Sequence, residues 1–343
     1  MPLRQDAYRV PRAYGPRIAA IGGGHGLSNL LRGLKQYTPN ISAIVTVADD
    51  GGGSGMLRQD LGMPPPGDIR NCCEALANTE SVLKDLMHYR FTEGALSGQS
   101  FGNLLLAALN GISPSFDAAV ARMSEVLAIT GRVLPVTTAD VRLEAVFENG
   151  ETVVGESVIA KYKKRVDCRI SHVRLLPERP QALPAALKAI READLIILGP
   201  GSLYTSVIPN LLVDGVVRAV QRSKAMKIYV CNVMTEDGET ENYTVSDHIE
   251  AIFRHSAPGL FPLCLVSSGR TPKSVAARYA LEDAAPVVLD EKRCRELGVE
   301  TVTRPVATVK EGKVLHHFQR LAREVLSLYS ERAFRVAGDR FRA

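Results

Sequence analysis

The sequence contains no unbroken apolar run of about 18 residues, the minimum for a membrane-spanning helix, so we expect no transmembrane segment. Its first residues, MPLRQDAYRVPRAYGPR, are basic and interrupted by proline. Because they lack the apolar core of a secretory signal, we expect no signal peptide here. We predict instead that residues 1–16 form a flexible arm that precedes the folded domain.

Cysteine occurs without the spacings that mark metal or redox sites. The six cysteines include no CxxC pair and no zinc-finger pattern. Cys72 and Cys73 fall in a predicted helix, whereas Cys231 and Cys264 fall in predicted strands. We therefore expect buried, reduced thiols, which are typical of a cytoplasmic protein.

A strong excess of charge of one sign is also missing, since the net charge is only +5 over 343 residues. The one short basic cluster, KYKKR at 161–165, is interpreted as a solvated face. A mildly basic protein suits an anionic small molecule, and this charge alone does not indicate nucleic acid. No Ser-His-Asp order and no metal quartet occur, so the sequence marks neither a nucleophile nor a zinc site.

The pattern that is present alternates strands and helices. RIAAI (17–21) predicts a short strand, helical apolar spacing follows it, and ISAIVTVA (41–48) predicts a second strand. Strand, helix and strand in this order form a βαβ unit with a right-handed crossover. Further apolar strands of the kind that a parallel sheet buries are LIILGP (195–200), KIYVCNVM (227–234) and LCLVSS (263–268). We predict an α/β fold with a doubly wound, mostly parallel, Rossmann-like sheet.

The middle of the chain has a different pattern. VRLEAVFENGETVVGESVIA (141–160) alternates with period two around Asn149-Gly150, which predicts a two-residue hairpin turn. RISHVRLL (169–176) predicts a third strand. We expect an antiparallel insertion over about residues 133–180, within a single domain spanning 17–325, followed by a helical tail over 326–343.

Small and polar residues follow several of the predicted parallel strands. They form GGGHG at 22–26, the Asp49-Asp50 loop, GPGS at 199–202, and Asn232. Ligands of open α/β sheets bind outside the carboxyl ends of the strands. We therefore expect these strand ends to converge on one ligand-binding rim.

The turn at 22–26 is predicted to bind phosphate. Glycine there frees backbone N–H groups to approach an anion, and the N-terminus of the following helix adds its dipole. The turn matches neither GxGxxG nor the P-loop pattern, so a plain tight turn is the alternative. His25 within it either takes part in acid–base chemistry or forms a local hydrogen bond.

The stretch ADDGGGSGMLRQDLGMPPPGDIRN (48–71) contains few residues that could pack in a core. Asp49 and Asp50 could hold ribose hydroxyls or a divalent cation, or cap the following turn. Arg58 and Arg70 are candidates to bind phosphate bidentately, or are ordinary surface arginines. We interpret the stretch as a ligand-holding loop.

The motifs are also recognisable together. GGGHGLSNLLRGLK, TVADDGGGSGMLRQDLGMPPPGDIRNC, SFGNLLLAAL, LGPGSLYTSVIPNLLV and YVCNVMTEDGETENYTVSDH resemble the YvcK/GlmR family of gluconeogenesis factors, which are relatives of 2-phospho-L-lactate transferase (CofD). The resemblance runs from 17 to about 325. It implies a CofD-like α/β fold and a cytoplasmic bacterial protein with a role in cell shape and envelope-precursor metabolism on gluconeogenic carbon sources. Family members bind UDP-N-acetylglucosamine (UDP-GlcNAc) as a regulatory ligand.

The resemblance further implies which residues contact the ligand. Carried over by motif, they are Gly23, Gly24, His25, Gly26, Asp49, Asp50, Ser54, Arg58, Asp68, Arg70, Asn71, Ser100, Asn103, Gly199, Gly201, Ser202, Tyr204, Thr205, Asn232, Tyr279 and His316. Two positions depart from the family pattern. His25 stands where the family usually has threonine, and His316-His317 stands where an Arg-His pair is expected.

The sequence therefore predicts a cytoplasmic, non-catalytic UDP-GlcNAc-binding regulator that requires no cofactor. Its expected partners are an envelope-precursor enzyme that it would regulate and further copies of itself in a homo-oligomer. The first alternative is a CofD-like transferase of a phosphate-containing group, in which Asp49 and Asp50 hold Mg²⁺. The second is an NAD(P)-binding protein, suggested by the βαβ unit.

Overall fold

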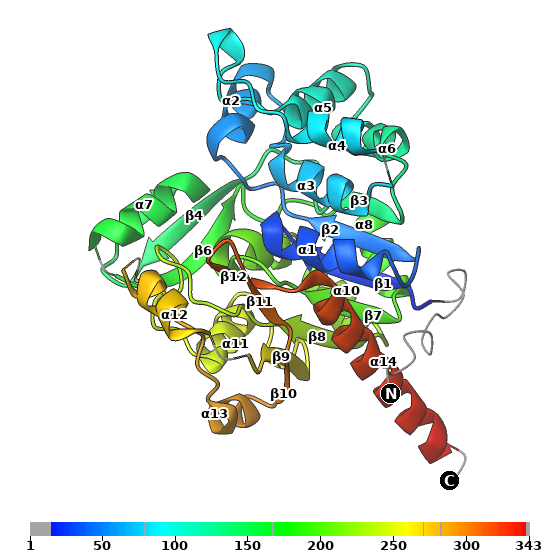
Figure 1. The fold of residues 1–343 in the computed structure, drawn as a ribbon, viewed down its shortest axis with the longest axis vertical. Helices are drawn as coiled ribbons and strands as arrows, with labels where there is room; N and C mark the ends of the chain where they lie inside the picture. Colours follow the sequence, from blue (N-terminus) through cyan, green and yellow to red (C-terminus); the bar gives the residue numbers. More distant parts are fainter. Residues whose placement is uncertain (1–14, 79, 167, 270, 282, 341–343) are drawn as a thin grey trace.

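A computed structural model describes residues 15–340 except 79, 167, 270 and 282 (Figure 1). The predicted N-terminal arm therefore lies almost wholly outside the described residues. No helix in the described part of the chain is both long and apolar enough to cross a membrane.

A seven-stranded parallel sheet forms the centre of the molecule, in the order β10-β9-β8-β7-β1-β2-β3. Its strands are β1 (Ile18–Gly22), β2 (Ile41–Val45), β3 (Arg132–Pro135), β7 (Leu195–Leu198), β8 (Met226–Val230), β9 (Leu263–Ser267) and β10 (Glu300–Arg304). Every residue of β1, β2 and β7 is buried, as expected for central strands covered on both faces. The predicted doubly wound α/β fold is confirmed.

The strand order reverses between β1 and β7. The chain proceeds from β1 to β2 and β3 in one direction, and from β7 to β8, β9 and β10 in the other. Because such crossovers are right-handed, opposite directions place the connecting helices on opposite faces of the sheet. The neighbouring connections after β1 and β7 therefore diverge, which opens a crevice at the carboxyl ends of these two strands.

Helices cover the sheet (Figure 1). They are α1 (Gly24–Leu34), α2 (Gly52–Leu61), α3 (Gly67–Leu76), α4 (Ser81–His88), α5 (Phe101–Gly111), α6 (Phe116–Val126), α7 (Glu156–Val166), α8 (Pro184–Glu192), α9 (Ile208–Leu211), α10 (Val216–Arg222), α11 (Val245–Arg254), α12 (Lys273–Ala280), α13 (Glu291–Glu296) and α14 (Phe318–Arg340). Helix α1 packs against α3 and α14. Gly33 allows close packing there, because a Cβ would meet the carbonyl oxygen of Phe318.

The antiparallel part is a three-stranded sheet in the order β5-β4-β6. Its strands are β4 (Arg142–Phe147), β5 (Thr152–Val154) and β6 (Ile170–Leu176). The hairpin turn includes Asn149-Gly150, but it contains three residues, 148–150, and not the predicted two. The Phe147 N–H donates to the Glu151 carbonyl (2.9 Å), and within the turn only Gly150 has a positive φ, 86°. The sequence also predicted strand for 156–160, which instead begins helix α7, since Gly155 (φ 106°) ends the strand.

Some boundaries differ from the predicted ones. Strand β3 is an edge strand of the main sheet, so the antiparallel part begins at β4 and not near residue 133. A two-stranded ribbon, β11 (Ala307–Lys310) with β12 (Lys313–His316), was not predicted. Helix α14 begins at Phe318 and continues through the expected boundary at 325/326.

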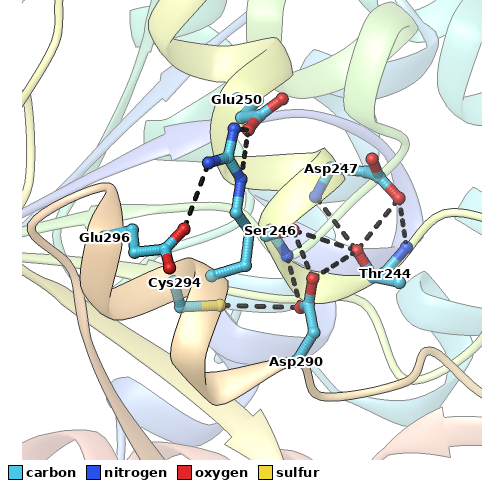
Figure 2. Close-up of polar contacts among 8 residues, drawn as sticks. Thr244, Ser246, Asp247, Glu250, Asp290, Cys294 and Glu296 are labelled. Carbon is cyan, nitrogen blue, oxygen red and sulfur yellow. Dashed lines mark hydrogen bonds and ion pairs between the residues drawn. The ribbon is translucent and has the colours of Figure 1, made fainter.

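A polar network joins α11 to α13 (Figure 2). Thr244 and Asp247 form a capping box at the start of α11. Asp290 accepts hydrogen bonds from the Ser246 N–H (3.0 Å) and the Thr244 hydroxyl (3.0 Å), and Cys294 contacts the same carboxylate. Burial opposes ionisation of Asp290, but the hydrogen bonds from Ser246 and Thr244 hold its pKa below the usual value.

We expect Asp290→Asn to lower the free energy of unfolding at pH 7 by about 1–2 kcal/mol, the scale of a hydrogen bond to a charged group. A carboxylate whose pKa is depressed by folding stabilises the protein above its unfolded pKa, and this contribution disappears as the pH falls through the folded pKa. The difference in melting temperature between variant and wild type should therefore shrink from pH 7 to pH 3. Asp60→Asn, at an exposed position on α2, is the control. An equal difference at both pH values would contradict the prediction.

Candidate ligand-binding site

A cavity of about 450 Å³ opens at the carboxyl ends of β1, β2 and β7, beside the point where the strand order reverses. A larger groove, of about 990 Å³, lies at the opposite edge of the sheet and is lined by residues such as Arg17 and Asp194, near the amino ends of β1 and β7. We place the site in the smaller cavity, because ligands of this fold bind at the carboxyl edge and because the glycine-rich loops meet there.

Many of the predicted site residues line this cavity. They are Gly24, His25, Gly26, Asp49, Ser54, Asp68, Arg70, Asn71, Asn103, Gly201 and Ser202. The cavity is also lined by Gly51, Gly52, Gly53 and Gly67 of the predicted ligand-holding loop, which were not named individually as ligand contacts. Four further lining residues were not among the predicted contacts, namely Arg90, Glu156, Ser206 and Glu236. The predicted residues Gly23, Asp50, Arg58, Ser100, Gly199, Tyr204, Thr205, Asn232, Tyr279 and His316 do not line it.

Two glycines let carboxylates enter the site. A Cβ on Gly23 would collide with a carboxylate oxygen of Asp68, and one on Gly67 would lie 2.8 Å from an oxygen of Asp49. Asp68 accepts a hydrogen bond from the Gly24 N–H, so an internal carboxylate occupies the turn that was predicted to bind phosphate. These glycines thus accommodate the protein's own acidic groups.

The side chains of the adjacent Asp49 and Asp50 have different hydrogen-bond partners. Asp49 lines the cavity and accepts the Gly51 N–H at 2.8 Å. Asp50 accepts the Ser157 N–H at 2.8 Å. Its carboxylate also lies close to Gly155, since a Cβ on Gly155 would be only 2.5 Å from an oxygen of Asp50. Asp50 therefore caps α7, and the two carboxylates do not converge as a cation-binding pair.

Three carboxylates share the acidic wall of the cavity. Burial, followed by the nearby Asp49 carboxylate, raises the pKa of Asp68 to about 7. Burial, followed by Asp49 and Asp68, raises the pKa of Glu156 to about 9. In the described part of the chain, no group of three or more His, Cys, Asp or Glu side chains is arranged to hold a metal ion. The raised pKa values of Asp68 and Glu156 favour the protonated forms of these two groups near neutral pH.

A basic wall faces the same cavity. Arg70 on α3 is fixed by Glu74, at 2.6 Å, and by the side-chain oxygen of Asn103, at 2.9 Å. Arg90 follows α4 and donates to the Gly98 carbonyl. A guanidinium held by two side chains is prepared to bind an anion, because little rotamer entropy remains to be lost.

Several predicted ligand contacts have structural roles. Arg58 is buried and forms an ion pair of 2.5 Å with Asp140. Ser100 caps α5 by accepting the Asn103 N–H. The Tyr279 hydroxyl accepts the Val314 N–H at 3.0 Å, and burial lowers the pKa of His316 to about 4.

The second glycine turn lies at the end of β7. The Asn232 side chain accepts the Gly201 N–H (3.3 Å) and donates to the Gly201 carbonyl (3.0 Å), so Asn232 positions the turn. Tyr204 is buried, with its hydroxyl 2.9 Å from that of Tyr243. Thr205 lines an adjoining cavity of about 220 Å³ together with Glu156.

The unassigned lining residues carried little signal in the sequence. Glu156 fell within a predicted strand. Neither Arg90 nor Glu236 stands directly at a strand end, where polar residues indicate a ligand site in this fold. Their place in the cavity depends on where α7 and the loops after α4 and β8 pack.

Comparison with known proteins agrees with this architecture. A family model described as 2-phospho-L-lactate transferase CofD matches residues 18–307. A protein of Thermoanaerobacterium thermosulfurigenes is 51% identical over 314 residues, covering 92% of this chain and 97% of that protein. The gluconeogenesis factor of Bacillus subtilis strain 168 is 46% identical, covering 92% and 99% of the two chains.

A solved structure is also similar. The crystal structure of a UPF0052-family protein from Bacillus halodurans superposes with a TM-score of 0.87 at 44% identity, covering 91% of this chain and 100% of that one. The family resemblance predicted from the sequence motifs is confirmed. The chain belongs to the gluconeogenesis factors, within the wider group of proteins that the CofD family model describes.

Proposed function

We propose that the protein is a cytoplasmic regulator that binds UDP-GlcNAc in the cavity at the carboxyl ends of β1, β2 and β7. The observation that carries the proposal is the presence of two arginines together with carboxylates and hydroxyls in the lining of one cavity of about 450 Å³. A nucleotide sugar has the matching chemistry, because it combines a diphosphate with many hydroxyl groups.

The two walls have distinct roles under this proposal. Arg70 and Arg90 bind the diphosphate, since guanidinium pairs bidentately with phosphate oxygens. Asp49 and Glu236 accept hydrogen bonds from ribose or sugar hydroxyls, and Ser202 adds a hydroxyl. Protons held by Asp68 and Glu156 reduce the repulsion between the acidic wall and the diphosphate.

The regulatory part of the proposal rests on family membership. The relatives carry the name gluconeogenesis factor, which describes a role and no reaction. We propose a corresponding role in cell shape and envelope-precursor metabolism on gluconeogenic carbon sources. An envelope-precursor enzyme as the regulated partner, and a homo-oligomer, remain predictions.

A transferase that uses Mg²⁺ is the second candidate. It is favoured by the description of the matching family model, which names a transferase, and by the carboxylates in the cavity. The Asp49-Asp50 pair does not fit a shared cation, because Asp50 caps α7. Of the two aspartates, only Asp49 lines the cavity and would be available to bind a cation there.

Calorimetric titration of UDP-GlcNAc with and without Mg²⁺, followed by chromatography of the recovered ligand, tests the proposal. Micromolar binding of intact ligand that is indifferent to Mg²⁺ would support the regulator. Cleaved ligand, or binding that appears only with Mg²⁺, would favour the transferase. No binding at all would overturn the assigned ligand and leave the NAD(P) alternative to be titrated next.

The two neighbouring aspartates should respond differently to substitution. We expect Asp49→Asn to change ligand affinity by about threefold or more, because its side chain lines the cavity. Asp50→Asn should leave affinity within about twofold and lower the melting temperature, because Asp50 caps α7. Calorimetry and thermal unfolding of both variants check this pair. A larger affinity loss in Asp50→Asn would show that Asp50 faces the ligand.

A further inference from the structure

A buried carboxylate fills the turn that follows β7. Glu239, which is 4% exposed, accepts the backbone N–H groups of Leu203 (3.1 Å), Tyr204 (3.0 Å) and Thr205 (2.9 Å). Consecutive N–H groups at the start of a helical segment are an arrangement by which proteins bind phosphates and carboxylates. We call these three N–H groups the 203–205 cradle. Here the protein itself supplies the carboxyl group that accepts the three N–H groups of the cradle.

The segment that carries Glu239 is attached to the antiparallel insertion. Lys163 on α7 is buried and pairs with Glu241 at 2.9 Å, and Lys164 pairs with Asp237 at 2.6 Å. The basic cluster at 161–165 was interpreted from the sequence as a solvated face. Two of its lysines instead pair with an acidic turn, which comprises residues 236–241. These ion pairs connect the segment that carries Glu239 to α7.

The same acidic turn reaches the ligand cavity. Glu236 lines the cavity, accepts the Ser202 hydroxyl at 2.8 Å and is hydrogen-bonded to Glu239. Burial, followed by the nearby Glu236, raises the pKa of Glu239, so the two carboxyl groups share a proton in their hydrogen bond. Ser202 and Ser206 flank the cradle in sequence, and both line the cavity. The cavity wall thus depends on the conformation that Glu239 imposes on the residues between them.

We propose that Glu239 is a positioning residue of the ligand site: its buried carboxyl group accepts all three N–H groups of the 203–205 cradle and so fixes Ser202 and Ser206 in the cavity wall. The ligand part of this inference rests on the proposed function, whereas occupation of the cradle does not. One consequence is that the cradle is closed to the ligand's phosphates, which leaves them to the basic wall formed by Arg70 and Arg90.

The test is chemical rescue. Glu239→Ala removes the carboxylate and leaves three N–H groups without an acceptor, so we expect a lower melting temperature and an affinity for UDP-GlcNAc reduced roughly tenfold. Sodium formate supplies a small carboxylate of the same chemistry. It should raise the melting temperature of the variant and restore its affinity, while leaving wild type unchanged. Sodium chloride at equal ionic strength controls for salt.

Two further variants complete the design. Glu148→Ala removes an exposed glutamate in the β4–β5 turn and should be insensitive to formate. Glu239→Gln keeps the side-chain shape and one acceptor oxygen, so we expect it to fold and to bind the ligand more weakly than wild type. It carries the test should Glu239→Ala fail to fold. Wild-type affinity in either folded variant at residue 239 would overturn the positioning role.

The outcomes separate this inference from the proposed function. A folded Glu239→Ala variant whose melting temperature does not respond to formate would overturn the role of the Glu239 carboxyl group as the acceptor in the cradle. Failure of wild type to bind UDP-GlcNAc would overturn the proposed function, while the thermal response to formate would still test the cradle.

Discussion

Replacing Arg70 with alanine is expected to weaken UDP-GlcNAc binding by about 1.5–3 kcal/mol, or roughly 10- to 150-fold, the range for a hydrogen bond to a charged group. Arg70 lines the cavity, and its guanidinium is already fixed by Glu74 and Asn103. The ligand's phosphate therefore meets a charge in place and loses little entropy in ordering it. Calorimetry on the wild type and the variant measures the effect.

Two comparisons isolate the contribution to binding. Arg70→Ala also leaves the buried Glu74 without its cation, so its melting temperature must be measured and binding compared well below it. Arg122→Ala is the matched control, because this exposed arginine donates to the Ile112 carbonyl and does not line the cavity. An unchanged dissociation constant in a folded Arg70→Ala variant would remove Arg70 from the site.

Replacing Glu156 with glutamine is expected to stabilise the protein at alkaline pH. Burial beside Asp49 and Asp68 raises the pKa of Glu156 from 4.5 to about 9. A carboxyl whose pKa is raised by folding stabilises the protein below its unfolded pKa, and that contribution is lost as the pH rises through the folded pKa. Between about pH 5 and pH 9, the free energy of unfolding should therefore fall by more in wild type than in the variant.

The expected gain is about 1–3 kcal/mol at pH 9, a few degrees in melting temperature, because neighbouring carboxyls share the proton and reduce the effect. At pH 4 the two proteins should be close to equal. Glu151→Gln, at an exposed position in the β4–β5 turn, is the control. A gain that is the same at pH 4 and pH 9 would show that Glu156 is not held protonated.

Such a gain would also bear on function. The close approach of Asp49, Asp68 and Glu156 destabilises the folded protein. Such destabilisation is typical of a ligand site, where groups are arranged for binding and not for the stability of the unoccupied fold. We therefore expect Glu156→Gln to be more stable than wild type and altered in its affinity for the ligand.

The architecture was predictable because its signals are local. Continuous apolar runs such as 195–198 predict strands buried on both faces. Asn149-Gly150 correctly predicts the place of the hairpin, although the turn has three residues and only Gly150 takes the positive φ expected of both. Helix α7 was missed because alternation in 151–160 is compatible with either state over so few residues. The ribbon β11–β12 was missed as well.

Part of the candidate site follows from the same local signals. Glycine and carboxylate after β1, β2 and β7 mark strand ends, and the rule that ligands bind at those ends brings Gly24, Asp49 and Gly201 to one cavity. The direction of each side chain does not follow from this rule. Arg58 turns to Asp140, and Asp50 turns to the start of α7, because partners distant in sequence lie there.

The sequence by itself determined the fold class, the family and the edge of the sheet at which the candidate cavity lies, since each depends on hydrophobic period, motif or strand ends. Only the tertiary structure decided which acidic groups enter the cavity and which carboxyl group fills the 203–205 cradle. Glu239 lies more than 30 residues from the cradle and Glu156 more than 100 from Asp49. Such pairs form because burial brings distant segments together, and the energies that select them depend on desolvation and neighbouring charge, which no local pattern encodes.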